Sequence, residues 1–197
     1  MEYTIVKKTD WDKVPIVKIA NVCWGYDQPD VEASAQLCYD ENFLYAKLTA
    51  KEKDIRSEER GPLAMPCRDS CLEFFVSPMS DGRYFNIEFN PDGGCFFGFG
   101  SGPSRLFRLL TEDPEKNILC PEGERTADGW SITYALPFDT VRLFFPGFKA
   151  EPGIRMRGNF YKCGDFTVKV HCFSWNPMAA DQTSFHYPPD FGTLIFS

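Results

Sequence analysis

The sequence predicts an all-β fold, in the form of a two-sheet antiparallel β-sandwich. Three observations predict it. The candidate strands are short, rich in Phe, Val, Tyr and Ile, and separated by Gly, Pro, Asp and Asn. Helical periodicity is almost absent. The 19 Phe, 8 Tyr and 4 Trp among 197 residues favour pleated sheet surfaces. A chain of this length and composition fits one domain over residues 1–197.

The candidate strands follow one another along the chain with turn residues between them. Residues 35–50 form two alternating runs around the turn Asp40-Glu41-Asn42. Residues 51–69 are charged and then Pro-rich, which predicts a long exposed loop. The segments SCLEFFVSP and YFNIEFNP flank Asp81-Gly82 and predict the clearest hairpin. Further strands are expected at 93–104, interrupted by glycines, and at 106–110, 129–136, 153–165 and 191–196. Residues 167–175 form a loop or a strand, and residues 137–141 a single helical turn.

The charge pattern excludes several classes of partner. A formal net charge of −7 and a pI near 4.9 oppose binding to nucleic acid, which normally requires clustered Lys and Arg. The first residues contain no apolar run of the length that a signal peptide or a membrane span needs. We therefore expect a cytoplasmic protein with neither a membrane nor a nucleic-acid partner.

The sequence contains eight cysteines, at 23, 38, 67, 71, 95, 120, 163 and 172. Since no export signal is visible, we expect mostly free thiols and no disulfide framework. Cys67 and Cys71 lie close together, but the sequence contains no second close pair. A zinc ribbon needs two such pairs, so none is predicted.

Side-chain parity sorts three strands into an apolar and a polar set, because successive side chains point to opposite faces. The apolar sets are Leu72, Phe74 and Val76; Phe85, Ile87 and Phe89; and Met156, Gly158 and Phe160. The polar sets contain Glu73; Asn86, Glu88 and Asn90; and Arg155, Arg157, Asn159 and Tyr161. If the strands are neighbours, one face belongs to the core and the other presents carboxylates, guanidiniums, amides and a phenol.

A polar sheet face of this kind suits sugar recognition, since bidentate Asp, Glu, Asn and Arg side chains match vicinal hydroxyl pairs. The alternative is a merely solvated face, which many antiparallel sheets have. Trp130 shares parity with Ile132, Tyr134 and Leu136 and is assigned to the core.

Six motifs occur in the order DSCLEFFVSP, YFNIEFNPDG, GWSITYALPF, RGNFYKCGD, FSWNPM and FHYPPDFGTLIF. In this order they resemble the family 9 carbohydrate-binding modules, specifically a divergent stand-alone bacterial group, from about Ala33 to the C-terminus. The resemblance implies a jelly-roll-like, DOMON-like sandwich. It also implies binding of mono- or oligosaccharides and association with a glycoside hydrolase system.

In that family two tryptophans clamp the sugar ring, and Trp175 falls where one of them is expected. The segment before Cys71 has no aromatic residue, so Met65 or the more distant Trp24 would have to substitute for the other. Some members bind structural calcium. Carboxylates at Asp27, Asp30, Asp40 and Asp92 leave that option open, with no dense ligand loop and no assigned metal ligands.

Two other function classes compete with sugar binding. Glu73 and Glu88 share the polar face, and glycosidases use paired carboxylates about 5 to 9 Å apart. Arg155 and Arg157 on the same face would hold both carboxylates ionised, which disfavours the protonated general acid that hydrolysis requires. We therefore predict no enzyme activity. The second rival is a protein-interaction module on the same face, which a sugar-binding screen would distinguish.

The sequence thus predicts non-catalytic carbohydrate binding. The predicted ligand-binding residues comprise one stacking ring, seven hydroxyl-binding side chains and two loop walls. They are Trp175; Arg68, Glu73, Asn86, Glu88, Arg157, Asn159 and Tyr161; and Phe185 and His186.

Overall fold

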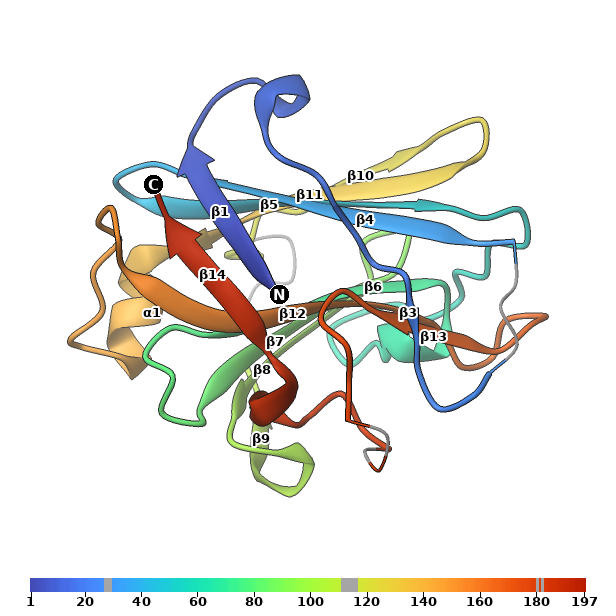
Figure 1. Ribbon diagram of the computed structural model, residues 1–197. Helices are drawn as coiled ribbons and strands as arrows, with labels where there is room; N and C mark the ends of the chain where they lie inside the picture. The colour runs from blue at the N-terminus through green and yellow to red at the C-terminus, as the bar shows by residue number, and fades with distance from the viewer. Residues whose placement is uncertain (27–29, 111–116, 180, 182) are drawn as a thin grey trace.

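The strands form two layers that face each other across the core (Figure 1), in a computed structural model that describes residues 1–26, 30–110, 117–179, 181 and 183–197. One layer contains β2 (Val17–Lys18), β4 (Glu32–Tyr39), β5 (Phe43–Lys51), β10 (Glu122–Arg125) and β11 (Gly129–Pro137). The other contains β3 (Asn21–Val22), β6 (Cys71–Ser77), β7 (Tyr84–Phe89), β8 (Cys95–Gly100), β9 (Leu106–Arg108), β12 (Arg155–Gly164), β13 (His171–Ser174) and β14 (Gly192–Phe196).

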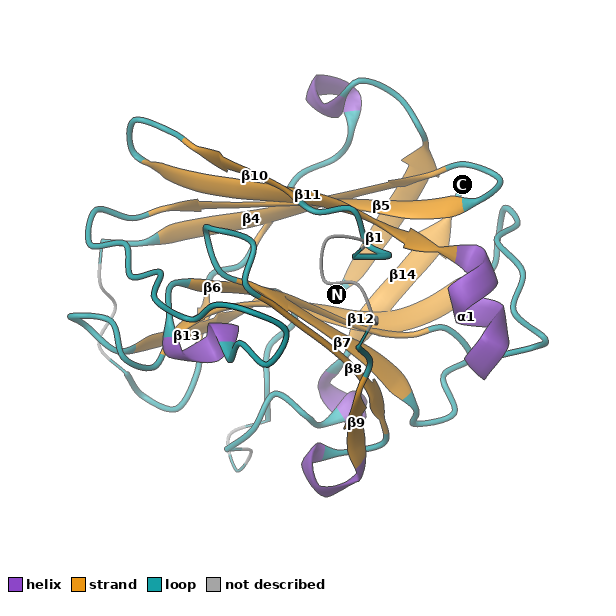
Figure 2. Cartoon of the chain, turned by 180° about the vertical axis from the view of Figure 1, so that it is seen from behind, coloured by secondary structure: helices purple, strands orange, loops and turns teal. Residues whose placement is uncertain are grey.

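Helices are few and short among the described residues. The α-helix α1 (Phe138–Phe144) lies at one end of the layers and buries Phe138 and Val141 (Figure 2). The 3₁₀ turns are η1 (Trp11–Lys13), η2 (Pro66–Arg68), η3 (Pro103–Arg105) and η5 (Pro188–Asp190). None of the described helices is long and apolar enough to cross a membrane.

Strand β1 (Glu2–Lys7) joins the two layers into one curled sheet. Its first four residues pair with β14, and Val6 and Lys7 pair with β4. Both pairings are parallel, whereas the other described pairings are antiparallel. The hydrogen-bonded path runs β10-β11-β5-β4-β1-β14-β12-β6-β7-β8-β9.

The all-β prediction is therefore confirmed, but the purely antiparallel two-sheet arrangement is not. The physical reason lies in the alternation of side chains, which is the same for a strand in a parallel pair and in an antiparallel pair. A pattern of alternating residues gives no sign that one strand divides its pairing between two sheet edges.

The parity argument is confirmed, because β7, β6 and β12 are neighbours in this order. The predicted apolar set packs into the core between the layers, together with Trp130, Ile132, Tyr134 and Leu136 of β11. The predicted hairpins are also present. Asp40 accepts hydrogen bonds from the backbone of Asn42 and Phe43 at the turn between β4 and β5. All eight cysteines are free thiols.

Candidate functional site

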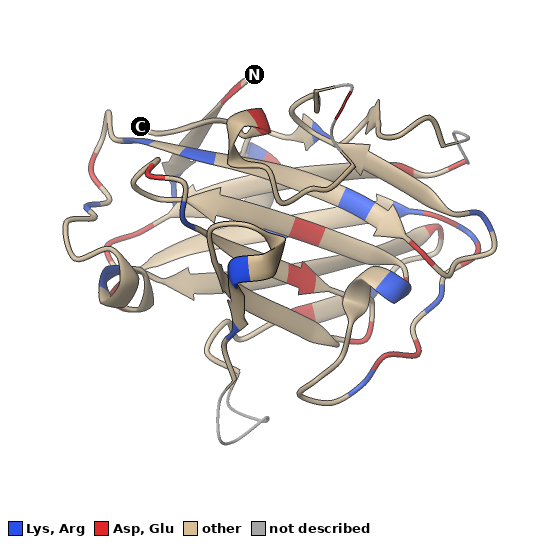
Figure 3. Cartoon of the chain, turned by 90° about the horizontal axis from the view of Figure 1, so that it is seen from below, with Lys and Arg blue, Asp and Glu red and all other residues tan. Residues whose placement is uncertain are grey.

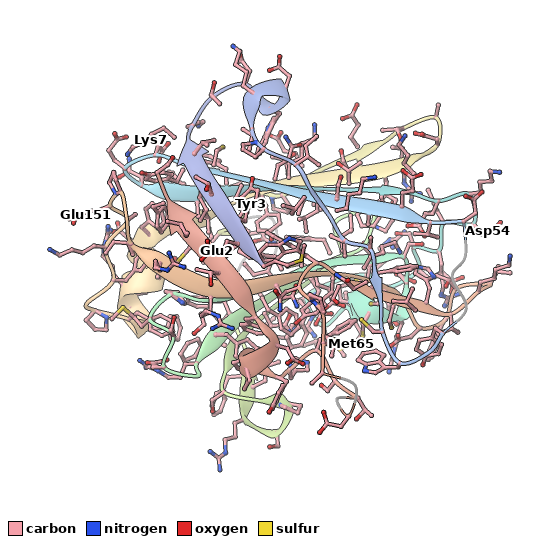
Figure 4. All side chains as sticks on the ribbon, in the orientation of Figure 1. Glu2, Tyr3, Lys7, Asp54, Met65 and Glu151 are labelled. Atoms are coloured by element: carbon pink, nitrogen blue, oxygen red, sulfur yellow. The ribbon has the colours of Figure 1, made fainter. Side chains whose placement is uncertain are left out.

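A cleft of about 630 Å³ lies over the outer face of β6, β7, β12 and β13. Its polar residues come from strand centres, so the sheet itself fixes their positions. Figure 3 looks onto the molecule from below and shows acidic residues within strands as well as in loops. Loops form the cleft walls: the segment after β3, the segment before η2, and residues 183–186. Met65, in the wall before η2, is labelled in Figure 4.

The floor is polar, and its side chains are almost fully buried. Glu73 of β6 lies directly opposite Glu88 of β7, and both are buried. Asn86 lies two residues before Glu88, and its amide donates to Glu88 Oε1 at 2.9 Å. Two side-chain oxygens in this floor, Glu88 Oε2 and Asn86 Oδ1, are buried without a hydrogen-bond donor among the described residues. A buried acceptor that receives no hydrogen bond destabilises the protein, so the floor is suited to a ligand that donates hydrogen bonds.

Burial raises the pKa of both carboxyls. The pKa of Glu88 rises to about 7, although the hydrogen bond from Asn86 and the charge of Arg108 both lower it. Burial raises the pKa of Glu73 well above its usual value, and the charge of Glu88 raises it further. Two facing carboxyls in a dry site favour retention of a proton near neutral pH. The floor then offers a donor as well as acceptors.

Stacked rings form one wall of the cleft. Tyr161 on β12 lies at the bottom of the stack, with the ring of Phe185 4.0 Å above it at 16°. The Trp24 indole covers Phe185 at 4.8 Å and 27°. Trp24 is the outermost ring and keeps 37% of its surface exposed. The stack therefore presents a rigid, flat platform to the cleft.

The backbone conformation of Trp24 is unusual. Its φ of 58° lies in the left-handed region, and Gly25 follows with a φ of 68°. For a bulky residue this conformation costs about 1–2 kcal/mol. Strained residues of this kind cluster at ligand sites, where the surrounding structure holds them in place. The turn points an indole toward the cleft rather than into the core.

A second aromatic residue comes from β8, on the same face of the sheet as Glu88. Phe96 of β8 lines the cleft, and the guanidinium of Arg108 lies 4.6 Å from its ring centroid. Gly98 leaves room for this ring, since a Cβ there would come within 2.6 Å of Phe96 Cε1. The cleft thus combines a dry polar floor with aromatic walls, which is typical of sugar sites.

The comparisons with known proteins agree with this chemistry. Residues 4–196 match the family described as carbohydrate-binding family 9. The chain belongs to this family. A search of curated proteins found no significant match.

Solved structures show the same fold over the whole chain. A Bacteroides uniformis protein to which carbohydrate binding is ascribed is 26% identical, with a TM-score of 0.83, over 100% of this chain and 98% of that one. A family 9 carbohydrate-binding module from Caldicellulosiruptor kristjanssonii in complex with cellotriose is 12% identical, with a TM-score of 0.70 and coverage of 100% and 93%. A family 9 module from that organism in complex with glucose is 12% identical, with a TM-score of 0.68, over 100% of this chain and 96% of that one. The family 9 domain described here is thus a non-catalytic carbohydrate-binding protein.

The structure brings together five of the ten predicted site residues of this family 9 domain. Glu73, Asn86, Glu88, Phe185 and His186 all line the cleft. His186 Nδ1 lies 2.8 Å from the hydroxyl of Tyr84. These five residues lie as the parity argument and the order of the motifs predict.

Trp175 is the main correction. Its indole is only 2% exposed and belongs to the core, against Tyr3 and Phe160. A Cβ on Gly192 would come within 2.5 Å of this ring. Trp175 follows β13 on the face that packs inward, so it stabilises the fold and cannot stack on a ligand. Trp24 is the exposed tryptophan of the cleft.

Arg68 and Arg157 also lie outside the cleft. Arg68 pairs with Glu59 at 3.3 Å. Arg157 donates to the backbone carbonyls of Phe191 and Pro189, because the first residues of β12 lie outside the cleft, next to the segment before β14.

Asn159 and Tyr161 are on the predicted face but are covered by loops. Asn159 donates to the carbonyl of Asn176 at 3.0 Å and accepts from its backbone amide at 2.8 Å. The Tyr161 hydroxyl donates to the carbonyl of Phe185 at 3.2 Å. Parity identifies their face correctly, but it gives no information on the loops that cover it.

The argument against hydrolysis from Arg155 and Arg157 is wrong, although the non-catalytic prediction agrees with the family. Arg155 pairs with Glu2, and Arg157 binds backbone carbonyls, so neither guanidinium holds Glu73 or Glu88 ionised. Among the calcium candidates, Asp27 lies outside the described residues. Asp40 caps a turn, Asp92 pairs with Arg60 and Arg125, and Asp30 pairs with Lys53.

Trp24 is the site residue that the main sequence argument missed, since it entered only as a substitute for the absent clamp residue. Its signal is the segment Trp24-Gly25-Tyr26, where two large rings flank a glycine in a polar stretch. Parity does not apply to such a turn.

Proposed function

We propose that the cleft binds a gluco-configured mono- or oligosaccharide, with one pyranose ring lying against Trp24. The observation that carries this proposal is the pair of buried acceptors without donors, Glu88 Oε2 and Asn86 Oδ1. Neighbouring sugar hydroxyls supply two donors at adjacent positions. The family 9 modules solved with glucose and with cellotriose support this ligand class.

The proposed configuration fits an aromatic ring that stands beside a polar floor. A pyranose with equatorial hydroxyls has a flat face of C–H groups, which packs on an aromatic ring. Its hydroxyls then point sideways from the ring edge. Trp24 provides the platform for the flat face, and the carboxyl floor meets the hydroxyl edge.

Calorimetric titration with glucose and cellotriose tests the proposal. Trp24→Ala should weaken binding by about 1 kcal/mol, which is about fivefold, because one stacking contact is lost. Glu88→Gln preserves the side-chain shape but replaces one carboxyl oxygen, which accepts hydrogen bonds, with an amide NH₂ that can only donate them. We expect it to cost about 1.5–3 kcal/mol, or at least tenfold in affinity.

Trp11→Ala is the matched control, since Trp11 is also partly exposed but lies in η1, away from the cleft. It should bind the sugar as the unmodified protein does. Equal affinities for the unmodified protein, Trp24→Ala and Glu88→Gln would exclude this cleft as the sugar site. Failure of the unmodified protein to bind any saccharide in a wide screen would favour a protein ligand instead.

Three further expectations belong with this proposal. We infer that the curled sheet is a jelly roll of DOMON-like type whose two layers are joined through β1. We also infer a cytoplasmic role in carbohydrate catabolism. A non-catalytic binding domain contributes to such a process through an enzyme, so we propose a glycoside hydrolase system as its partner.

A further inference from the structure

A ladder of cysteines crosses three adjacent strands at the floor of the cleft. Cys71 of β6 lies in register with Cys163 of β12, and Cys163 lies in register with Cys172 of β13. Side chains directly opposite each other in antiparallel strands share a face, with Cβ atoms about 4.5–5.5 Å apart. The three sulfurs therefore lie on the outer, cleft-side face of the sheet, in one buried cluster.

The carboxylate of Glu73 joins this ladder. The Cys163 thiol donates to Glu73 Oε1 at 3.0 Å. The ligand atoms of Cys71, Glu73 and Cys163 all lie within 4.8 Å of one another. Cys71 is fully buried, and the other two are each 2% exposed. Three groups that bind metals thus converge in a dry site.

We propose that Cys71, Glu73 and Cys163 bind one divalent cation of the zinc class. A tetrahedral zinc ion has Zn–S distances near 2.3 Å and Zn–O distances near 2.0 Å, which separates its ligand atoms by about 3.5–3.8 Å. The cluster reaches this geometry through small side-chain movements. Two sulfurs among three ligands disfavour calcium and magnesium, which prefer oxygen.

The surroundings of Glu73 support a cation. A buried carboxyl group costs free energy unless it is paired or hydrogen-bonded. Among the described residues its hydrogen-bond donor is the Cys163 thiol, and thiols are weak donors. When the ion binds, the two thiols and the protonated Glu73 carboxyl release their protons to solvent, and two metal–sulfur bonds and one metal–oxygen bond form. The new thiolates and the carboxylate then surround a positive charge.

The fourth position of the ion faces the cleft. Glu73, Cys163 and Cys67 all line that cavity, and the carbonyl of Cys67 lies 3.8 Å from Cys163 Sγ. Cys67 and Cys172 are further cysteines that line this cavity. Strand register supplies the second close cysteine pair that the sequence lacks, because it places Cys71 opposite Cys163.

Cobalt binding tests the proposal. The chain is reduced with a phosphine, stripped with a chelator and titrated with Co²⁺, a spectroscopic substitute for zinc. We expect one equivalent of Co²⁺ to produce thiolate-to-cobalt charge-transfer absorption and the strong visible bands of a tetrahedral site. One equivalent of Zn²⁺ should then abolish both. Cys71→Ser and Cys163→Ser should each weaken binding at least tenfold.

The matched control is Cys38→Ser, which replaces a buried cysteine in the other layer. It should keep the full cobalt spectrum. Far-UV circular dichroism and thermal melting establish that each variant is folded. The proposal is overturned if the unmodified protein gives no charge-transfer band, or if folded Cys71→Ser and Cys163→Ser keep the band unchanged. A site elsewhere is the conclusion if Cys38→Ser loses the band and the other two variants keep it.

Discussion

His186 shows how one residue at the cleft couples folding to pH. Burial lowers its pKa from 6.5 to about 4, and its Nδ1 lies against the hydroxyl of Tyr84. The folded protein therefore keeps this imidazole neutral at pH values where the unfolded chain protonates it. As pH falls from 6.5 toward 4, the unfolded state gains a proton and the folded state does not. Stability must fall over that range.

We therefore expect His186→Gln to remove part of the acid sensitivity of folding. Between pH 6.5 and pH 4, the free energy of unfolding of the unmodified protein should fall by up to about 3 kcal/mol more than that of the variant. Urea unfolding at several pH values measures this difference. Other titrating groups contribute to both proteins and cancel. Parallel pH profiles for the two proteins would show that His186 is not held neutral.

The two tryptophans show what sequence can predict about a single residue. Strand parity correctly places Glu73, Asn86 and Glu88 on the cleft face, because their positions follow from the pleat alone. Trp175 lies just beyond β13, where the chain turns its indole inward against Phe160. Trp24 lies in a left-handed turn. The direction of a side chain outside regular strands depends on packing that local patterns do not describe.

At the scale of elements, β1 holds the curled sheet together. It pairs in parallel with both β14 and β4, so it links the layer that carries the cleft to the opposite layer. Its Tyr3 side chain strengthens the second link. The hydroxyl accepts from the backbone amide of Leu37 at 2.8 Å and donates to the carbonyl of Pro15 at 2.7 Å. Tyr3 is labelled on β1 in Figure 4.

We expect Tyr3→Phe to reduce the free energy of unfolding by about 1–3 kcal/mol, because it leaves a buried amide of β4 without its acceptor. Chemical denaturation measures the change. Tyr187→Phe is the control, since that tyrosine is 37% exposed and lies in a surface loop. Equal losses in the two variants would mean that the hydroxyl of Tyr3 does not stabilise the junction.

The strands themselves were predictable to a large extent. Hairpins such as β6–β7 combine local turn residues with alternation, and both signals lie within a few residues of each other. The junction at β1 depends on partners far along the chain, at β14 and β4. The same holds for the cysteine ladder, where register between β6 and β12 makes a cluster that spacing alone excludes.

At the scale of the whole molecule, a buried ion pair spans the two layers. Glu52 follows β5 in one layer, and Lys162 lies on β12 in the other, with Lys162 Nζ 3.2 Å from Glu52 Oε1. Both side chains are almost fully buried. Glu52 accepts two further hydrogen bonds, from Trp130 Nε1 at 2.6 Å and from the Ser70 hydroxyl at 3.0 Å. Lys162 Nζ also lies 2.9 Å from His171 Nε2. The network connects strands from both layers near the cysteine ladder.

A buried pair of this kind adds little to stability compared with apolar residues, but each member depends strongly on the other. Glu52→Gln leaves the buried ammonium of Lys162 without its counter-charge. Lys162→Met leaves the buried carboxylate of Glu52 without its counter-charge. Each variant should lose about 3–5 kcal/mol in the free energy of unfolding. The double variant should lose clearly less than the sum, because no uncompensated charge remains. Chemical denaturation of all four proteins gives the coupling energy. Strictly additive losses would mean that the two charges do not stabilise each other across the layers.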